Sequence, residues 1–206
     1  MERRNSISGE LILITGGAAS GKSGYAENLA VSMNTAPMKQ TLWYLATMHF
    51  DTEDPETIQR IEKHRKARAG KGFRTLEQER DLVGLSDTFR KGDIILLEDL
   101  PNLLANEMFS PLTSADPKEM IDTNSEEALF AFLERKILYP IREWLEKGIC
   151  ILIVGSRIAE DLPQYRRDGE ESVEAYKKGL SYLQRELGKS AAMVTEVVCG
   201  IPLRCK

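Results

Sequence analysis

The sequence has few cysteines, few histidines and no long apolar run. Its 206 residues include 3 cysteines and 2 histidines. Cys150, Cys199 and Cys205 lack the spacing of a metal site, and we expect reduced thiols in a cytoplasmic protein. No stretch reaches the roughly 20 apolar residues that a membrane-spanning helix needs. The apolar run near the N-terminus is also too short for the core of a secretory signal.

A strong excess of charge is absent as well. The chain has 28 Lys and Arg against 32 Asp and Glu, which gives a formal net charge of −4 at pH 7. This acidic balance argues against nucleic acid as a partner. There is no internal repeat or low-complexity segment. We expect a single P-loop nucleotide-binding domain over residues 1–206, with a surface loop or insertion at residues 110–124, which contain two prolines among turn-forming residues.

The strongest feature that is present is a phosphate-binding loop. Residues 16–23 read Gly-Gly-Ala-Ala-Ser-Gly-Lys-Ser and directly follow the apolar run 11–15. The glycines let backbone N–H groups surround a phosphate, while Lys22 reaches the β and γ oxygens and Ser23 holds Mg²⁺. A helix that starts after the loop points the positive end of its dipole at the same anion. The pattern predicts that the chain binds a nucleoside triphosphate. The predicted phosphate-binding residues are Gly16, Gly17, Ala18, Ala19, Ser20, Gly21, Lys22 and Ser23.

Apolar runs alternate with helical patterns along the whole chain. Several runs are continuously apolar, as is typical of strands covered on both faces. The sequence therefore predicts an α/β fold with a mostly parallel sheet flanked by helices, similar to the P-loop NTPases. The expected strands are 11–15, 41–46, 72–76, 93–97, 149–154 and 191–198. The expected helices are 21–33, 55–69, 77–89, 125–147 and 170–187.

One expected strand ends in two acids, Glu98 and Asp99. In phosphate-loop folds a carboxylate at the end of a neighbouring strand typically meets Mg²⁺ or its water shell. Either acid fits this role on spacing alone. The alternative is a pair of solvated acids that end a strand.

His64 lies within a basic segment. Arg60, His64 and Arg68 are spaced at i, i+4 and i+8, so the expected helix 55–69 would place them on one face. Cations around an imidazole favour its neutral form, which is the nucleophilic form that could attack an α-phosphorus. The residues alone favour the alternative, a solvated basic helix that contains a histidine.

Taken together, these segments resemble the bifunctional adenosylcobinamide kinase/adenosylcobinamide-phosphate guanylyltransferase family of cobalamin synthesis. The phosphate loop by itself would fit many kinases, and the combination of motifs is much more specific. The segments that carry the resemblance are residues 16–23, Tyr25 to Glu27, Tyr44 to Thr47, Arg60 with Ile61, His64 to Arg68, Phe73 to Glu77, Leu96 to Glu98 with Asn106 eight residues on, and Cys199 to Lys206.

The resemblance implies two successive transfers. A nucleoside triphosphate would phosphorylate adenosylcobinamide, and GTP would then donate GMP to that phosphate through an adduct on His64, with Lys22 as the second catalytic residue. ATP and GTP would be substrates, and Ser23 and Glu98 would hold Mg²⁺. The resemblance further implies a homotrimer.

The resemblance also assigns residues to the guanine nucleotide. Either Glu77 or Glu98 suits guanine, because a carboxylate accepts from both the N1–H and the amino group. The implied nucleotide residues are Ala46, Thr47, Met48, Arg65, Lys66, Ala67, Arg68, Glu77 and Glu98.

One segment departs from the family pattern. Residues 154–161 stand where the family usually has Asn-Glu-Val-Gly. Two other functions therefore stay open. One is a P-loop kinase for another small alcohol or nucleotide, and the other is a nucleotide-binding relative without corrinoid chemistry.

Overall fold

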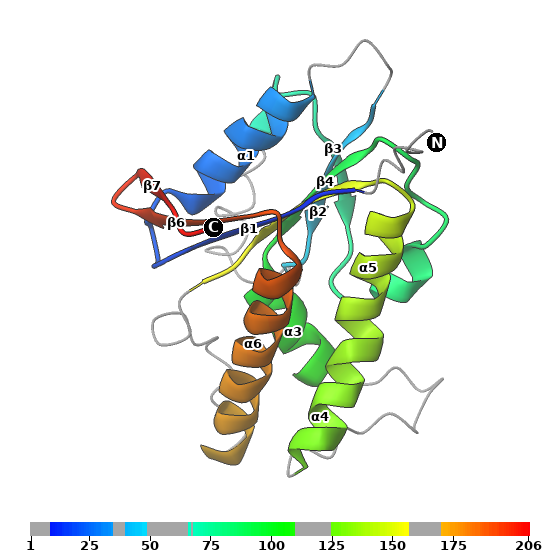
Figure 1. Ribbon diagram of the computed structural model, residues 1–206, viewed down its shortest axis with the longest axis vertical. Helices are drawn as coiled ribbons and strands as arrows, with labels where there is room; N and C mark the ends of the chain where they lie inside the picture. The colour runs from blue at the N-terminus through cyan, green and yellow to red at the C-terminus, as the bar shows by residue number, and fades with distance from the viewer. Residues whose placement is uncertain (1–8, 35–39, 49–65, 67, 110–124, 157–169) are drawn as a thin grey trace, which may run out of the picture.

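A seven-stranded sheet forms the centre of the computed structural model (Figure 1), which describes residues 9–34, 40–48, 66, 68–109, 125–156 and 170–206. The strand order is β3-β2-β4-β5-β1-β6-β7. Neighbouring strands pair in parallel, and the edge strand β7 pairs antiparallel with β6. The mostly parallel α/β sheet predicted from the sequence is therefore confirmed. The strands are β1 Leu11–Gly16, β2 Leu42–Ala46, β3 Arg74–Glu77, β4 Ile94–Glu98, β5 Cys150–Val154, β6 Met193–Val198 and β7 Ile201–Arg204.

Helices follow most strands along the chain. The expected helix 125–147 is a continuous helical segment in which the π-helical η2 joins α4 to α5. The expected helix 55–69 lies outside the described residues except at 66, 68 and 69, and the expected loop 110–124 lies wholly outside them. The helices are α1 Lys22–Met33, η1 Leu82–Leu85, α3 Leu100–Phe109, α4 Glu126–Leu133, η2 Glu134–Leu138, α5 Tyr139–Glu146 and α6 Glu170–Ser190.

The expected helix 77–89 is wrong. Residues up to Glu77 join β3, and the N–H of Gln78 donates to the carbonyl of Ala46 at 2.9 Å. Asp81 then adopts a left-handed conformation, with φ 60, that a helix cannot contain. Only the single 3-10 turn η1 follows. Strand pairing with β2 therefore overrides the local helical preference.

Two elements escaped the sequence analysis. Helix α3 starts directly after the acids of β4, where Asp99 Oδ1 accepts a hydrogen bond from the N–H of Asn102 at 2.8 Å and so caps the helix. Strand β7 is joined to β6 by Cys199 and Gly200, which both have positive φ, 49 and 80. Two such residues make the tight turn that matches the twist of a β-hairpin.

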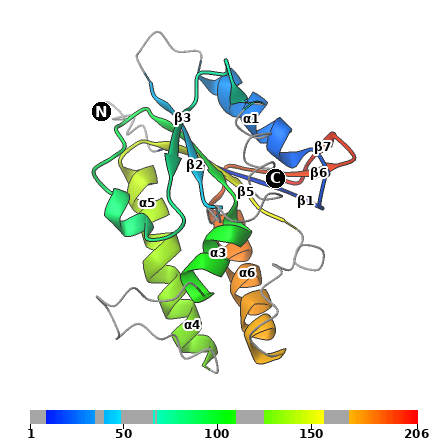
Figure 2. The ribbon, with the colours of Figure 1, turned by 180° about the vertical axis from the view of Figure 1, so that it is seen from behind.

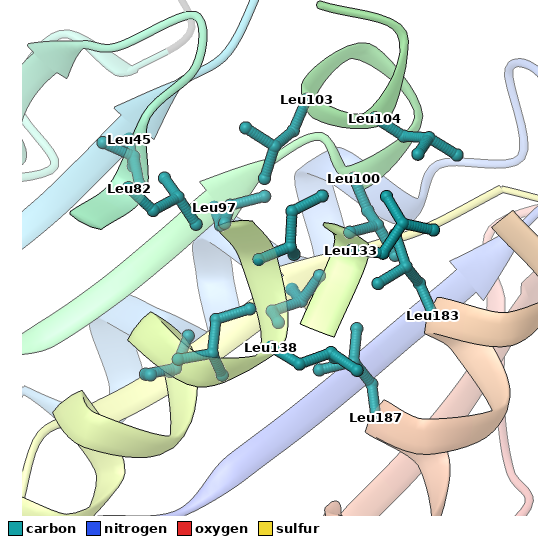
Figure 3. Packing of buried hydrophobic residues seen from close by; sticks show 14 of the residues in the cluster. Leu45, Leu82, Leu97, Leu100, Leu103, Leu104, Leu133, Leu138, Leu183 and Leu187 are labelled. Carbon is teal, nitrogen blue, oxygen red and sulfur yellow. The ribbon is translucent and has the colours of Figure 1, made fainter. Parts of the chain in front are cut away.

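Helices cover both faces of the sheet. Alternate strand residues form two cores, because successive side chains of a strand point to opposite faces. Ile12 and Ile14 pack under α1, whereas Leu11 and Leu13 belong to the larger core beneath α3, α4, α5 and α6. Figures 1 and 2 show α1 on one side of the sheet and the other helices opposite. Figure 3 shows leucines of the larger core converging between the sheet and these helices.

The carboxyl ends of the parallel strands lie at one edge of the sheet. Because β1 to β6 are parallel, the carboxyl ends of these strands share one edge. In open α/β sheets this edge is where ligands bind. Within the described residues, no helix combines the length and the apolar character that crossing a membrane requires.

Candidate nucleotide site

The phosphate loop lies between β1 and α1, at the edge where the parallel strands end. Its last residue before the helix, Gly21, has φ 91, and its carbonyl accepts a hydrogen bond from the N–H of Tyr25 at 3.0 Å. Lys22 Nζ donates to the carbonyl of Gly17 at 3.2 Å, so the lysine folds back over the loop. The first turn of α1 thus follows a loop of the shape that binds phosphate at a helix N-terminus.

The C-terminal hairpin supports this loop from the side. Gly200, in the β6–β7 turn, donates its N–H to the carbonyl of Ser20 at 2.8 Å. In the same hairpin, β6 lies so close to Gly16 that a Cβ there would be 2.5 Å from the carbonyl oxygen of Val197. The sequence analysis gave the last residues no structural role of this kind. The loop is therefore supported at both its first residue and Ser20 by one hairpin that is far from it along the chain.

The ends of β3, β2 and β4 form a row beside the loop. Ala46 at the end of β2 is paired with Glu77 of β3 on one side and with Glu98 of β4 on the other. Paired residues of adjacent parallel strands point to the same face, and strands lie about 4.8 Å apart. Both glutamates thus stand on the α1 face, with Ala46 between them. Strand β5 separates β4 from β1.

Glu98 and Asp99 have different surroundings. Asp99 Oδ1 caps α3, as described above. Glu98 is half-buried on the face that α1 covers, and its Oε2 accepts a hydrogen bond from the hydroxyl of Tyr44 at 3.0 Å. The geometry thus favours Glu98 as the acid that faces the phosphate-loop helix.

Arg68 brings a buried cation to the same face. Its side chain is only 8% exposed, and its Cζ lies 3.6 Å from the centroid of the Tyr44 ring. Its Nε and Nη1 atoms are buried without a hydrogen-bond partner among the described residues. Burial, and next the Glu98 carboxylate, raise the pKa of Tyr44 far above its ordinary value, so the phenol keeps its proton.

An ion pair joins α1 to the segment that follows Arg68. Glu27 is buried in α1, and its Oε2 lies 2.7 Å from Lys71 Nζ. The side chains are 4% and 29% exposed for Glu27 and Lys71, respectively. The pair therefore fixes the distance between the helix of the phosphate loop and the chain that carries Arg68.

We expect Glu27→Gln to lower the free energy of unfolding by about 1–2 kcal/mol, because the amide keeps an acceptor but loses the charge that pairs with Lys71. Urea unfolding measures this loss. The matched control is Glu126→Gln, whose partner Lys178 lies 2.7 Å away with both side chains exposed. There we expect less than about 0.5 kcal/mol. Equal losses in the free energy of unfolding at the two positions would contradict the prediction that the buried pair stabilises the protein more than the exposed pair.

Thr47 and Asn106 tie the strand ends together. The Thr47 hydroxyl donates to the carbonyl of Asp99 and accepts from its N–H, both at 2.8 Å. Asn106 Nδ2, buried in α3, donates to the carbonyls of Thr47 at 2.7 Å and Glu79 at 3.0 Å. Thr47 thus directs its hydroxyl to the protein backbone. In the sequence, Asn106 belongs to the family resemblance, eight residues after Glu98.

Some of the remaining predicted site residues are described by the structure and others are not. Ala46 and Met48 are half-buried at the end of β2, while Lys66 and Glu77 are exposed. His64, Arg65 and Ala67 lie outside the described residues, as does most of the divergent segment 154–161.

The oxygen-bearing residues of the site suit Mg²⁺ bound with a nucleotide. Mg²⁺ takes oxygen ligands and commonly uses one or two protein groups together with phosphates and water. Ser23 at the start of α1 and Glu98 at the end of β4 supply such oxygens, and Tyr44 occupies only Oε2 of Glu98. Among the described residues there is no group of three His, Cys, Asp or Glu side chains that would form a metal site without a nucleotide.

Fold and site together define a P-loop nucleotide-binding protein of the α/β class: a phosphate loop between strand and helix, with acidic strand ends along the same edge of a parallel sheet. Residues 12–205 match the family described as "Cobinamide kinase / cobinamide phosphate guanyltransferase". The chain belongs to this family.

A curated relative and two solved structures accompany this match. The chain is 34% identical over 128 residues to the "Bifunctional adenosylcobalamin biosynthesis protein CobU" of Escherichia coli (strain K12). The match covers 62% of this chain and 66% of that protein, which is just under two thirds of its length. The flagellar accessory protein FlaH from Methanocaldococcus jannaschii overlaps 92% of this chain and 71% of its own, with TM-score 0.44 and 18% identity. A second solved structure, described as an ATPase domain, overlaps 91% of this chain and 68% of its own, with TM-score 0.44 and 11% identity.

Proposed function

We propose that this protein phosphorylates adenosylcobinamide with ATP or GTP and then transfers GMP from GTP to the new phosphate, through an intermediate in which GMP is bound to His64. The family match supports the two reactions, and the phosphate loop supports the use of nucleoside triphosphates. The product would be adenosyl-GDP-cobinamide, a step of cobalamin synthesis.

The observation that carries this proposal is the buried guanidinium of Arg68. Two of its nitrogens have no partner among the described residues, and burying such donors unpaired is costly. A polyphosphate held by the loop at residues 16–23 would supply acceptor oxygens to them. His64 precedes Arg68 by four residues, which on the helix expected from the sequence is about one turn. We propose on this spacing that the nucleophile acts on the same phosphates.

The guanylyl transfer would proceed by two displacements. The neutral imidazole of His64 attacks the α-phosphorus of GTP, and the bond from this phosphorus to the bridging oxygen breaks, so pyrophosphate leaves. An oxygen of cobinamide phosphate then attacks the same phosphorus, and the bond to the imidazole nitrogen breaks. Each attack is easier than direct transfer to a weak phosphate nucleophile.

The chain's own residues would hold the reactants for these steps. Lys22 and Arg68 stabilise negative charge on the phosphates, and backbone N–H groups of the loop fix their position. Mg²⁺, when bound through Ser23 and Glu98, supplies further charge neutralisation. Glu77 would recognise guanine by accepting from its N1–H and amino group while Glu98 holds Mg²⁺; Glu98 would take the guanine only if it does not hold the metal.

Intact-mass measurement after incubation with Mg²⁺ and GTP tests the proposal. We expect a mass increase of one GMP on the wild type, no increase with ATP in place of GTP, and none on His64→Ala. Adding adenosylcobinamide phosphate should discharge the adduct and yield adenosyl-GDP-cobinamide. GTP binding without an adduct would overturn the histidine mechanism, and turnover of adenosylcobinamide by ATP would then test the kinase step separately.

A further inference from the structure

Tyr44 is a buried titratable residue to which neither proposed reaction gives a role. It is 4% exposed and lies in β2, two residues before the strand end. Its hydroxyl donates to Glu98 Oε2 at 3.0 Å, and its ring lies 3.6 Å below Cζ of Arg68. Phe73 packs edge-on against the same ring, with centroids 5.9 Å apart. One side chain therefore contacts both the carboxylate and the cation of the candidate site.

We propose that Tyr44 is a positioning residue that holds Glu98 through its hydroxyl and Arg68 through its ring, and so keeps both charged groups available to the nucleotide. This inference rests on the proposed function, because it needs Glu98 and Arg68 to act on a nucleotide. It assigns a separate task to each half of the side chain.

The ring holds the guanidinium by its face. A cation above an aromatic ring is attracted by the ring quadrupole, and more strongly where water is excluded. This contact is made over the ring and uses no N–H hydrogen bond of the guanidinium. Nε and Nη1 have no partner among the described residues. Stacking on Tyr44 therefore orients the cation and spares its hydrogen-bond donors for an anion.

The hydroxyl holds the carboxylate by one oxygen. Glu98 Oε2 accepts from Tyr44, and among the described residues there is no hydrogen bond to Oε1, so this oxygen can bind a ligand. In this hydrogen bond the phenol O–H is the donor and the carboxylate oxygen is the acceptor.

Tyr44 contacts two opposite charges. Glu98 accepts a hydrogen bond from its hydroxyl and Arg68 lies over its ring, and in the described part of the chain no ion pair between the two charges is present. At a site with limited access to water two such charges attract each other strongly. If the ring were removed, the two groups would be free to pair, and both would lose the atoms that they would present to a ligand.

The decisive test separates the hydroxyl from the ring. Tyr44→Phe removes the hydrogen bond to Glu98 and keeps the ring under Arg68, whereas Tyr44→Leu removes both. Thermal unfolding first establishes that each variant is folded. Titration of a fluorescent GTP analogue with Mg²⁺ then gives the affinity. We expect Tyr44→Phe to weaken binding about tenfold, as expected for a hydrogen bond to a charged group.

A double-mutant cycle distinguishes positioning from a merely structural role. If Tyr44 acts through Glu98, then Tyr44→Phe should weaken binding by less than about twofold in a Glu98→Gln background. Additive losses would overturn the hydroxyl's assigned role. Wild-type affinity in a folded Tyr44→Phe would overturn it as well. We expect Tyr44→Leu to bind at least about tenfold more weakly than Tyr44→Phe, because Arg68 also loses its support.

Tyr182 offers a matched control. It lies on α6, and Cζ of Arg185 stands 5.5 Å from the centroid of its ring. Tyr182→Phe and Tyr182→Leu remove the same chemical groups as the two Tyr44 variants. For both Tyr182 variants we expect a GTP affinity within about twofold of the wild type. If the wild type forms no GMP adduct, the proposed guanylyl transfer through His64 fails. If it forms the adduct and Tyr44→Phe binds GTP normally, only the role of Tyr44 fails.

Discussion

Replacing Gly16 by alanine should weaken the binding of GTP and ATP by at least about 100-fold. A Cβ at this position would lie 2.5 Å from the carbonyl oxygen of Val197 and 2.6 Å from Ser20 Oγ. Val197 is paired with Gly16 in the sheet, so its carbonyl cannot move without breaking the β1–β6 pairing. The phosphate loop must shift instead. Titration with fluorescent nucleotide analogues measures the loss.

Gly24→Ala is the control for this prediction. Gly24 lies in α1, and a Cβ there would meet no atom within 4 Å. Because alanine has a higher helix propensity than glycine, we expect a gain of about 0.5–1 kcal/mol in the free energy of unfolding. Nucleotide affinity should stay within about twofold of the wild type. Normal binding by a folded Gly16→Ala would show that the loop tolerates the displacement.

Asn106→Asp should have the largest effect on stability among the variants considered. Asn106 Nδ2 donates to two backbone carbonyls, those of Thr47 and Glu79. An aspartate would place a carboxylate oxygen against these two acceptors. The position is buried, since Asn106 is only 3% exposed. We expect a loss of about 3 kcal/mol or more in the free energy of unfolding near pH 8, measured with urea.

The pH dependence of this loss follows from the same contacts. Burial and two facing carbonyls would raise the pKa of the new carboxyl in the folded state above its unfolded value. Only the protonated form can donate, so the stability deficit should be smallest at acid pH and grow as pH rises through the folded-state pKa. Measurements at pH 5 and pH 8 test this sign. A deficit that shrinks with rising pH would contradict it.

Asn102→Asp is the matched control for Asn106→Asp. Asn102 is half-buried in the first turn of the same helix, where a negative charge suits the helix dipole. We expect a change of less than about 0.5 kcal/mol. Asn106→Asp should weaken nucleotide binding and Asn102→Asp should not, because Asn106 joins the chain after β2 to the chain after β3.

Local pattern predicted most of the elements and failed at identifiable places. Continuous apolar runs located the parallel strands, and the glycine pattern at residues 16–23 located the phosphate loop. Residues 77–89 were wrongly assigned to a helix, because pairing with β2 draws Glu77 into a strand and Asp81 takes a left-handed conformation. Strand β7 was missed because its turn, Cys199-Gly200, lacks the usual hairpin residues.

In the candidate site, too, some features followed from the sequence and others only from tertiary contacts. Spacing alone left Glu98 and Asp99 as alternatives, and the family resemblance pointed to Glu98. Their contacts differ in the structure: Asp99 caps α3, while Glu98 faces α1 with Tyr44. Thr47 was assigned to the nucleotide, but its hydroxyl bonds the backbone of Asp99. A backbone contact of this kind leaves no mark in residue types or their spacing.

The sequence alone determined that the protein has a phosphate loop at the start of a mostly parallel α/β sheet, since both follow from short stretches of neighbouring residues. The tertiary structure decided how the site is held. Tyr44 meets Glu98 across 54 positions of the chain, and Asn106 meets Thr47 across 59. Gly200 supports Ser20 from the far end of the chain. Such contacts depend on the order and register of the strands, which bring distant residues together and which no local pattern specifies.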